Sequence, residues 1–217
     1  MNKEWAELNK TMQLQLKKKD TFDEGIVTLF ELRNQLWNTI LSYKKDLSRE
    51  VFDAIPYINA DGYHSKTIAY SLWHIFRIED IVAHTLIKGD EQVFFSKGYD
   101  KKINSPIITT GNELIKQEIA DFSKQLDLKE LYSYLLDVKK STEKILKGIS
   151  FEDTKKKIPD DRRKELEDLH VVSEDESAVW LIDYWCKKDV KGLIQMPFSR
   201  HWIMHIEACE RIKSKCS

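Results

Sequence analysis

The stretch that decides the fold is residues 21–43, which read TFDEGIVTLFELRNQLWNTILSY and contain one glycine and no proline. Its apolar residues recur three or four positions apart, which is the spacing of an amphipathic α-helix. Thr21 and Glu24 have the spacing of a capping box, in which two side chains satisfy free backbone amides at a helix start. The stretch therefore predicts a long helix with one face in a core. The residues expected to recur on that face are Val27, Leu29, Phe30, Leu32, Leu36, Ile40 and Leu41.

Three further stretches carry the same helical spacing. They are residues 65–87, residues 127–148, and a last stretch that begins at Pro197 or Ser199 and ends at Lys213. Gly89 is a stop signal for the first of them, and Asp127 with Glu130 forms another capping pair. Shorter helices are expected over residues 3–16, over residues 112–125 and after Ser173. The chain has only 7 glycines and 4 prolines in 217 residues, which favours long unbroken helices.

These patterns predict an all-α protein, since no stretch shows the alternation of a strand. Four long helices with short additional ones indicate a four-helix bundle. We expect residues 1–217 to form a single domain, with the polar residues 151–172 as an exposed insertion before the last helix.

The balance of charge argues against several classes of partner. Lys and Arg number 35 and Asp and Glu number 36, so the chain lacks the basic excess of a nucleic-acid binder.

No apolar run approaches the roughly 18 residues that span a bilayer. The first residues resemble no signal peptide. Cys186, Cys209 and Cys216 match no zinc ribbon or redox pair, and free thiols fit a reducing compartment. We therefore expect a cytoplasmic protein that binds neither nucleic acid nor membrane.

His201 and His205 are the first candidate site residues. They stand four positions apart in the last predicted helix, so both imidazoles lie on one helix face. Phe198, Ala208 and Ile212 share that face, which points it at the core. A buried imidazole needs a partner for its ring nitrogens. Spacing alone leaves two interpretations open, a shared metal ion or hydrogen bonds to carbonyls and hydroxyls. The residues expected on the opposite side are Arg200, Ile203, Glu207, Glu210 and Arg211.

His74 is the candidate for a third ligand. It lies in the middle of the second predicted helix, on a stripe that flanks the main core face. A lone histidine in such a place is more often an interior residue than a ligand. His64, His84 and His170 lie near helix ends or in polar surroundings, and we interpret them as ordinary. Cys209 continues the row of His201 and His205 but drifts off its line, so we expect a buried, inert thiol.

Two short stretches resemble the metal-site helices of the DinB/YfiT-like superfamily. They are residues 71–80, SLWHIFRIED, and residues 197–205, PFSRHWIMH. Members of that family are four-helix bundles with one histidine on the second helix and a His-x-x-x-His pair on the fourth. The resemblance implies that His74, His201 and His205 hold one divalent metal ion. It also implies a homodimer, and one of two chemistries: hydrolysis by water that the metal activates, or transfer of a low-molecular-weight thiol. The chain departs from the family in its length and in residues 151–172.

Three histidine ligands leave coordination positions open, as in catalytic metal sites, and imidazole suits zinc and nickel. Glu79 and Glu207 point away from the histidine stripes, so neither is placed as a general base. This favours thiol transfer over hydrolysis, with a small molecule, such as a low-molecular-weight thiol, as substrate. The alternative is a non-catalytic helical module that binds a ligand or partner. Trp180, Tyr184 and Trp185 would be its contact surface, unless they pack in the core.

Overall fold

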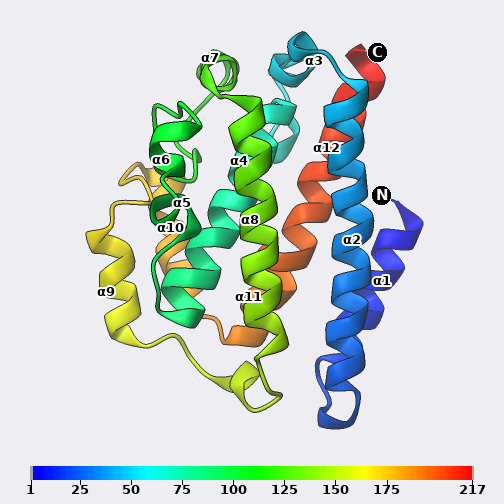
Figure 1. Ribbon diagram of the computed structural model, residues 1–217, viewed down its shortest axis with the longest axis vertical. Helices are drawn as coiled ribbons and strands as arrows, with labels where there is room; N and C mark the ends of the chain where they lie inside the picture. Colours follow the sequence, from blue (N-terminus) through cyan, green and yellow to red (C-terminus); the bar gives the residue numbers. More distant parts are fainter. Residues whose placement is uncertain (1, 217) are drawn as a thin grey trace.

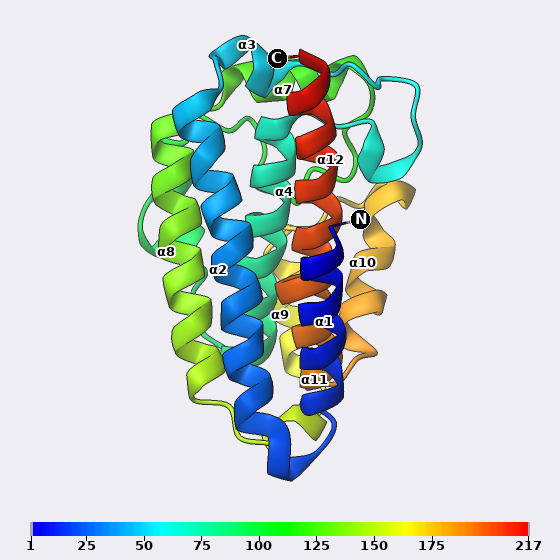
Figure 2. The same cartoon turned by 90° about the vertical axis from the view of Figure 1, so that its right-hand side faces the viewer.

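The computed structural model describes residues 2–216, and this part of the chain is all-α (Figure 1). Four long elements run alongside one another: α2, α4 with its extension, α8 and α12 (Figures 1 and 2). Their bounds are Phe22–Asp46 for α2, Ile68–Asp80 for α4, Leu128–Lys147 for α8 and His201–Cys216 for α12. No strand occurs within residues 2–216, where Lys157 and Asp189 form an isolated bridge. The prediction of an all-α protein is confirmed.

Shorter helices surround these four. Helix α1, Lys3–Gln15, packs against α2 on one side of the molecule, and α9 and α10 lie towards the other side (Figure 1). The remaining helices are α3 Arg49–Asp53, α5 Val93–Ser96, α6 Tyr99–Lys102, α7 Gln117–Gln125, α9 Asp160–Asp168, α10 Glu176–Cys186 and α11 Val190–Gln195. None of the helices within residues 2–216 has the length and apolar character that crossing a membrane requires.

Two of the long helices adjoin π-helical turns, one at the end of α4 and one at the start of α12. The π-helix Ile81–Lys88 extends α4, and Gly89 closes it in the left-handed conformation (φ 74°), as its role of stop signal predicts. The π-helix Met196–Arg200 leads directly into α12, so His201 is the first α-helical residue after it. A π-turn changes the angular position of the residues that follow it. It therefore helps to set the direction in which the face of His201 points.

The helix caps agree with the sequence in one case and differ in another. Asp127 accepts a hydrogen bond of 3.0 Å from the Glu130 amide, which confirms the predicted cap of α8. The predicted capping box at Thr21 is wrong, because the Thr21 hydroxyl donates instead to the carbonyl of Gln15 at 2.8 Å. The chain enters α2 through the short 3-10 turn Lys19–Thr21, so the hydroxyl faces the preceding helix rather than the free amides of α2.

The polar segment of residues 151–172 is more ordered than the sequence indicates. Its centre forms α9, and Leu166 of that helix is fully buried against the second of two hydrophobic clusters. Val171 and Val172 are buried in the same cluster. A few apolar residues anchor the segment, although its charged residues dominate the sequence pattern.

The buried stripe of α2 differs from the expected one at two positions. Val27 is 66% exposed and Leu41 is 42% exposed, so the expectation that they lie in the core is wrong. The stripe passes instead through Ile26, Leu29, Arg33, Leu36, Ile40 and Tyr43, all of which are buried. Val27 follows Ile26 and therefore lies about 100° away from it around the helix.

Arg33 occupies the middle of that stripe and pairs with a carboxylate of α4. Its guanidinium donates two hydrogen bonds to Glu79, of 2.9 and 2.8 Å, and both side chains are fully buried. Glu79 also accepts a bond of 2.8 Å from Trp202 Nε1, and Arg33 donates to the Phe198 carbonyl at 3.0 Å. This network joins α2, α4 and the start of α12, and so it fixes α12 beside α4.

Candidate metal centre

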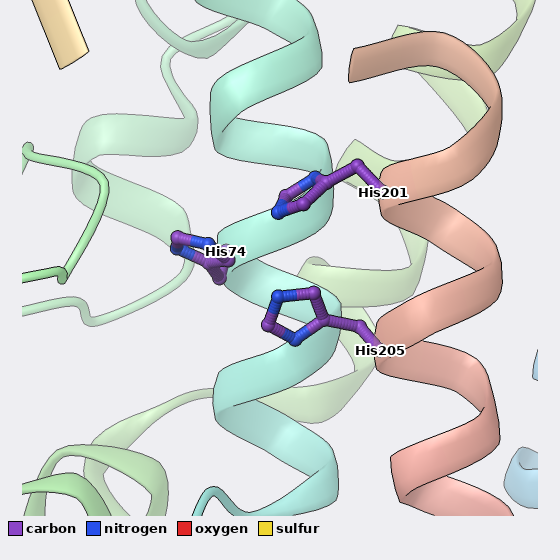
Figure 3. A group of neighbouring side chains, drawn as sticks. All are labelled: His74, His201 and His205. Atoms are coloured by element: carbon purple, nitrogen blue, oxygen red, sulfur yellow. The ribbon is translucent and has the colours of Figure 1, made fainter. Parts of the chain in front are cut away.

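The structure brings together the three histidines that the sequence singles out. His74 projects from α4, and His201 and His205 project from α12 towards it (Figure 3). One ring nitrogen of each lies within 4.8 Å of one from each of the others. The ring centroids are 5.0 Å apart for His74 and His201, 4.8 Å for His74 and His205, and 4.7 Å for His201 and His205. Three imidazoles thus face one point between two helices.

The face of α12 that carries the pair is buried as expected. His201 is 8% exposed and His205 is 4% exposed, and Phe198, Ala208 and Ile212 of the same stripe are buried with them. Ile203 was expected on the outer side, but it is only 5% exposed. It belongs to the same hydrophobic cluster as Trp202, so α12 buries a wider arc than the stripe alone.

Two contacts fix the ring of His74. Its Nδ1 lies 2.8 Å from the carbonyl oxygen of Thr110, which can only accept, so Nδ1 carries the proton and Nε2 keeps its lone pair. The ring of Tyr70 stacks on it at 5.5 Å with an angle of 13°. Tyr70 in turn donates to the carbonyl of Gly111 at 2.8 Å. A carbonyl that orients the second ring nitrogen is typical of histidines that bind metals.

The rings of His201 and His205 each have a buried nitrogen, Nδ1, without a hydrogen-bond partner among the described residues. A buried polar atom left without a partner costs about 1–3 kcal/mol. The cluster of donor atoms comprises three imidazoles, a set that suits zinc or nickel. Bonds of about 2.0–2.1 Å to a tetrahedral ion place ligand nitrogens roughly 3.3 Å apart, and here they lie within 4.8 Å of one another. The residues therefore fit a divalent ion.

The environment keeps all three imidazoles neutral. Burial lowers the pKa of His74 to about 4, the bond to Thr110 opposes this in part, and the charge of Lys66 adds to the lowering. Burial also holds the pKa of His201 and of His205 well below the usual value, and the neighbouring imidazoles act in the same direction. Neutral imidazole is the form that binds metals. The site is thus in its ligand form at neutral pH.

Three residues before α4 border the site, and sequence reasoning missed two of them. The ring of Tyr63 lies 5.8 Å from that of His205, and Lys66 Nζ lies 4.9 Å from the ring centroid of Tyr70. The ring of His64, interpreted as ordinary, lies 4.0 Å from that of Tyr63 at a tilt of 48°, and His64 contacts Arg211, outside the histidine cluster. The predicted helix of residues 65–87 includes Lys66, but α4 begins at Ile68, and Tyr63 lies in the short 3-10 turn Gly62–His64, which no sequence pattern marks.

The remaining candidates lie where the sequence places them. Glu79 belongs to the ion pair with Arg33, and Glu207 accepts a bond from the Asn2 amide at 2.5 Å, so both have partners outside the histidine cluster. Cys209 is fully buried, and burial raises the pKa of its thiol to about 12. An inert thiol is therefore the correct interpretation. His84 pairs with Asp90 at 2.6 Å.

The aromatic group of α10 divides between core and surface. Trp185 is 1% exposed and packs in the second hydrophobic cluster, so it is not available as a contact residue. Trp180 is 50% exposed, and the ring of Tyr184 lies 5.6 Å from it. The exposed part of the predicted contact surface is thus Trp180 with its neighbour Tyr184.

A comparison with models of known protein families gives no match, and a comparison with curated protein sequences gives none either. The buried cluster of His74, His201 and His205 is therefore the feature from which a function can be inferred.

Proposed function

We propose that the protein is a metal-dependent enzyme in which His74, His201 and His205 hold one zinc or nickel ion. The observation that carries this proposal is the convergence of three buried, neutral imidazoles from two helices on one point. No protein group forms a hydrogen bond with Nδ1 of His201 or of His205 among the described residues. A shared metal ion would explain why three imidazoles are buried together. Three protein ligands leave a position for substrate, as in catalytic sites.

The proposal includes the fold type and the assembly that the resemblance implies. The four long elements α2, α4, α8 and α12 would form the bundle of a DinB/YfiT-like protein. In that bundle the second long helix carries His74 and the fourth carries the pair, which is the family's arrangement. A homodimer and a cytoplasmic location belong to the same proposal.

Transfer of a low-molecular-weight thiol is the chemistry that we favour. When bound, a divalent ion acidifies a water or thiol ligand at neutral pH. Hydrolysis also needs a group that handles protons, and within residues 2–216 the donor cluster includes no carboxylate. The role of the protein is to hold His74 through Thr110, to bury the ligands and to exclude bulk water around them.

The test is a screen of zinc- or nickel-loaded protein with small thiols and a fluorogenic electrophile, together with ester and amide substrates. We expect thiol conjugation that disappears in His205→Ala and persists in His170→Ala, which removes an exposed imidazole outside the cluster. Hydrolysis of the ester or amide substrates without thiol conjugation would support a hydrolase instead of a thiol transferase. A protein that holds one equivalent of metal but turns over no substrate would contradict an enzymatic role.

One observation favours a second candidate function, a non-catalytic binding module. Trp180 is 50% exposed and Val179 beside it is 42% exposed, and exposed tryptophan is typical of contact surfaces. In this case Trp180→Ala would abolish association with a partner while leaving the fold and the metal content unchanged.

A further inference from the structure

Lys66 lies beside the histidine cluster, just before α4. Its ammonium is 4.9 Å from the centroid of the Tyr70 ring, and that ring is 5.5 Å from the ring of His74. The distance from the ammonium to the His74 ring therefore cannot exceed the sum of these two separations. Lys66 lies two residues before the start of α4, and Tyr70 and His74 follow it four residues apart on one face of that helix.

The charge of Lys66 has no acidic partner. Burial lowers the pKa of Lys66, and within residues 2–216 no carboxylate forms an ion pair with it. The side chain is half-buried, although a lysine ordinarily extends its ammonium fully into water or pairs it. A hollow of about 440 Å³ opens beside it, lined also by Asp61, Ser65 and Lys116. Small molecules can thus approach Lys66 from solvent.

Lys66 is the charged side chain among the described groups that shift the pKa of the three histidines, while Asp61 lines the hollow beside Lys66 and Glu113 acts on Tyr70. Lys66 and the imidazole of His64 both lower the pKa of His205, and Lys66 does the same to His74. No acidic side chain is among the groups that act on the three histidines. A divalent ion held by neutral imidazoles would add two further positive charges. The complementary ligand is therefore an anion.

We propose that Lys66 binds a carboxylate of the substrate while a second atom of that substrate occupies the open coordination position at His74, His201 and His205. This inference rests on the metal-dependent function proposed above and narrows its substrate to thiols that bear a carboxylate. A single ammonium matches the single charge of a carboxylate, whereas phosphate sites in proteins usually gather several donors.

Protein loaded with cobalt(II) instead of zinc or nickel allows thiol binding to be measured without any reaction. A thiolate bound to cobalt absorbs in the near ultraviolet, so the absorbance reports binding. The probes are 3-mercaptopropionate and 6-mercaptohexanoate, each compared with the neutral alcohol of equal length. The wild type should bind at least one acid about tenfold more tightly than its alcohol, as one partly screened charge-assisted hydrogen bond allows. Lys66→Met should abolish this preference and leave the Kd of the alcohols unchanged, and Lys66→Arg should restore part of it.

Lys116→Met is the matched control, since it removes a lysine from the same hollow and should keep the preference. If Lys66→Met takes up no cobalt, Lys66→Gln is measured in its place. A wild type without preference, or a preference that survives loss of the Lys66 charge, overturns the inference alone. No cobalt uptake by the wild type, or no thiolate absorption with any of the four thiols, contradicts the metal-dependent function and this inference together.

Discussion

Replacing Glu79 with leucine tests the buried network that holds α12 beside α4. Glu79 and Arg33 are both fully buried, so the substitution leaves a guanidinium in the interior with one remaining carboxylate contact, to Glu143 at 3.3 Å. It also removes the acceptor of Trp202 Nε1. Breaking a buried ion pair by removing one partner costs about 3–5 kcal/mol. We expect the free energy of unfolding to fall by about that amount.

The assay is urea unfolding of the metal-free protein, followed by circular dichroism and tryptophan fluorescence. The double variant Arg33→Leu with Glu79→Leu should recover much of the loss, because an apolar pair of similar volume often replaces a buried ion pair without penalty. A loss below about 1 kcal/mol for Glu79→Leu, or a double variant less stable than the single one, would refute the reasoning.

Three further predictions concern the imidazoles, the aromatic residues of α10 and a helix cap. The metal-free protein should lose stability as the pH falls from 6.5 towards 4, because the unfolded chain binds protons that the three buried imidazoles do not; His74, with a folded pKa of about 4, contributes about 3 kcal/mol of this loss. The urea midpoint against pH measures it, and His74→Gln should remove the share of His74 and leave the rest. Trp185→Ala should lower the free energy of unfolding by about 3–5 kcal/mol and Trp180→Ala by less than about 1 kcal/mol, because only Trp185 is buried. Thermal melts measure both, and equal melting temperatures for the two variants would contradict this difference in burial. Asp127→Ala should cost about 1 kcal/mol by urea unfolding, and Asp127→Asn should restore most of it.

The helices follow closely from periodicity, because each long one must bury an apolar stripe. The errors within them arise where the stripe is not purely apolar. Arg33 lies at the centre of the buried face of α2, and only its partner on another helix makes that position tolerable. A pattern of apolar residues alone therefore shifts towards Val27 and Leu41, which are exposed. Leu166 shows the reverse error, since one buried leucine anchors a helix that is otherwise charged.

The cluster of histidines could be predicted for a similar reason, and its surroundings could not. His201 and His205 lie one helical turn apart, so their common direction is a property of the helix itself. The resemblance then supplied His74. The carbonyl of Thr110 belongs to a loop, and Lys66 lies before the observed start of α4 although the predicted helix of residues 65–87 includes it. Their positions depend on how those segments pack over α4, which local sequence does not encode.

Metal content is the most direct test of the proposed centre. Protein without a histidine tag, as wild type, as His201→Ala and as His170→Ala, is purified in parallel and its metals are measured by mass spectrometry. We expect about one equivalent of zinc or nickel in the wild type and in His170→Ala, and a loss of most of it in His201→Ala. Protein that takes up no ion even after incubation with excess zinc and nickel, or a His201→Ala variant with undiminished content, would contradict the three-histidine site.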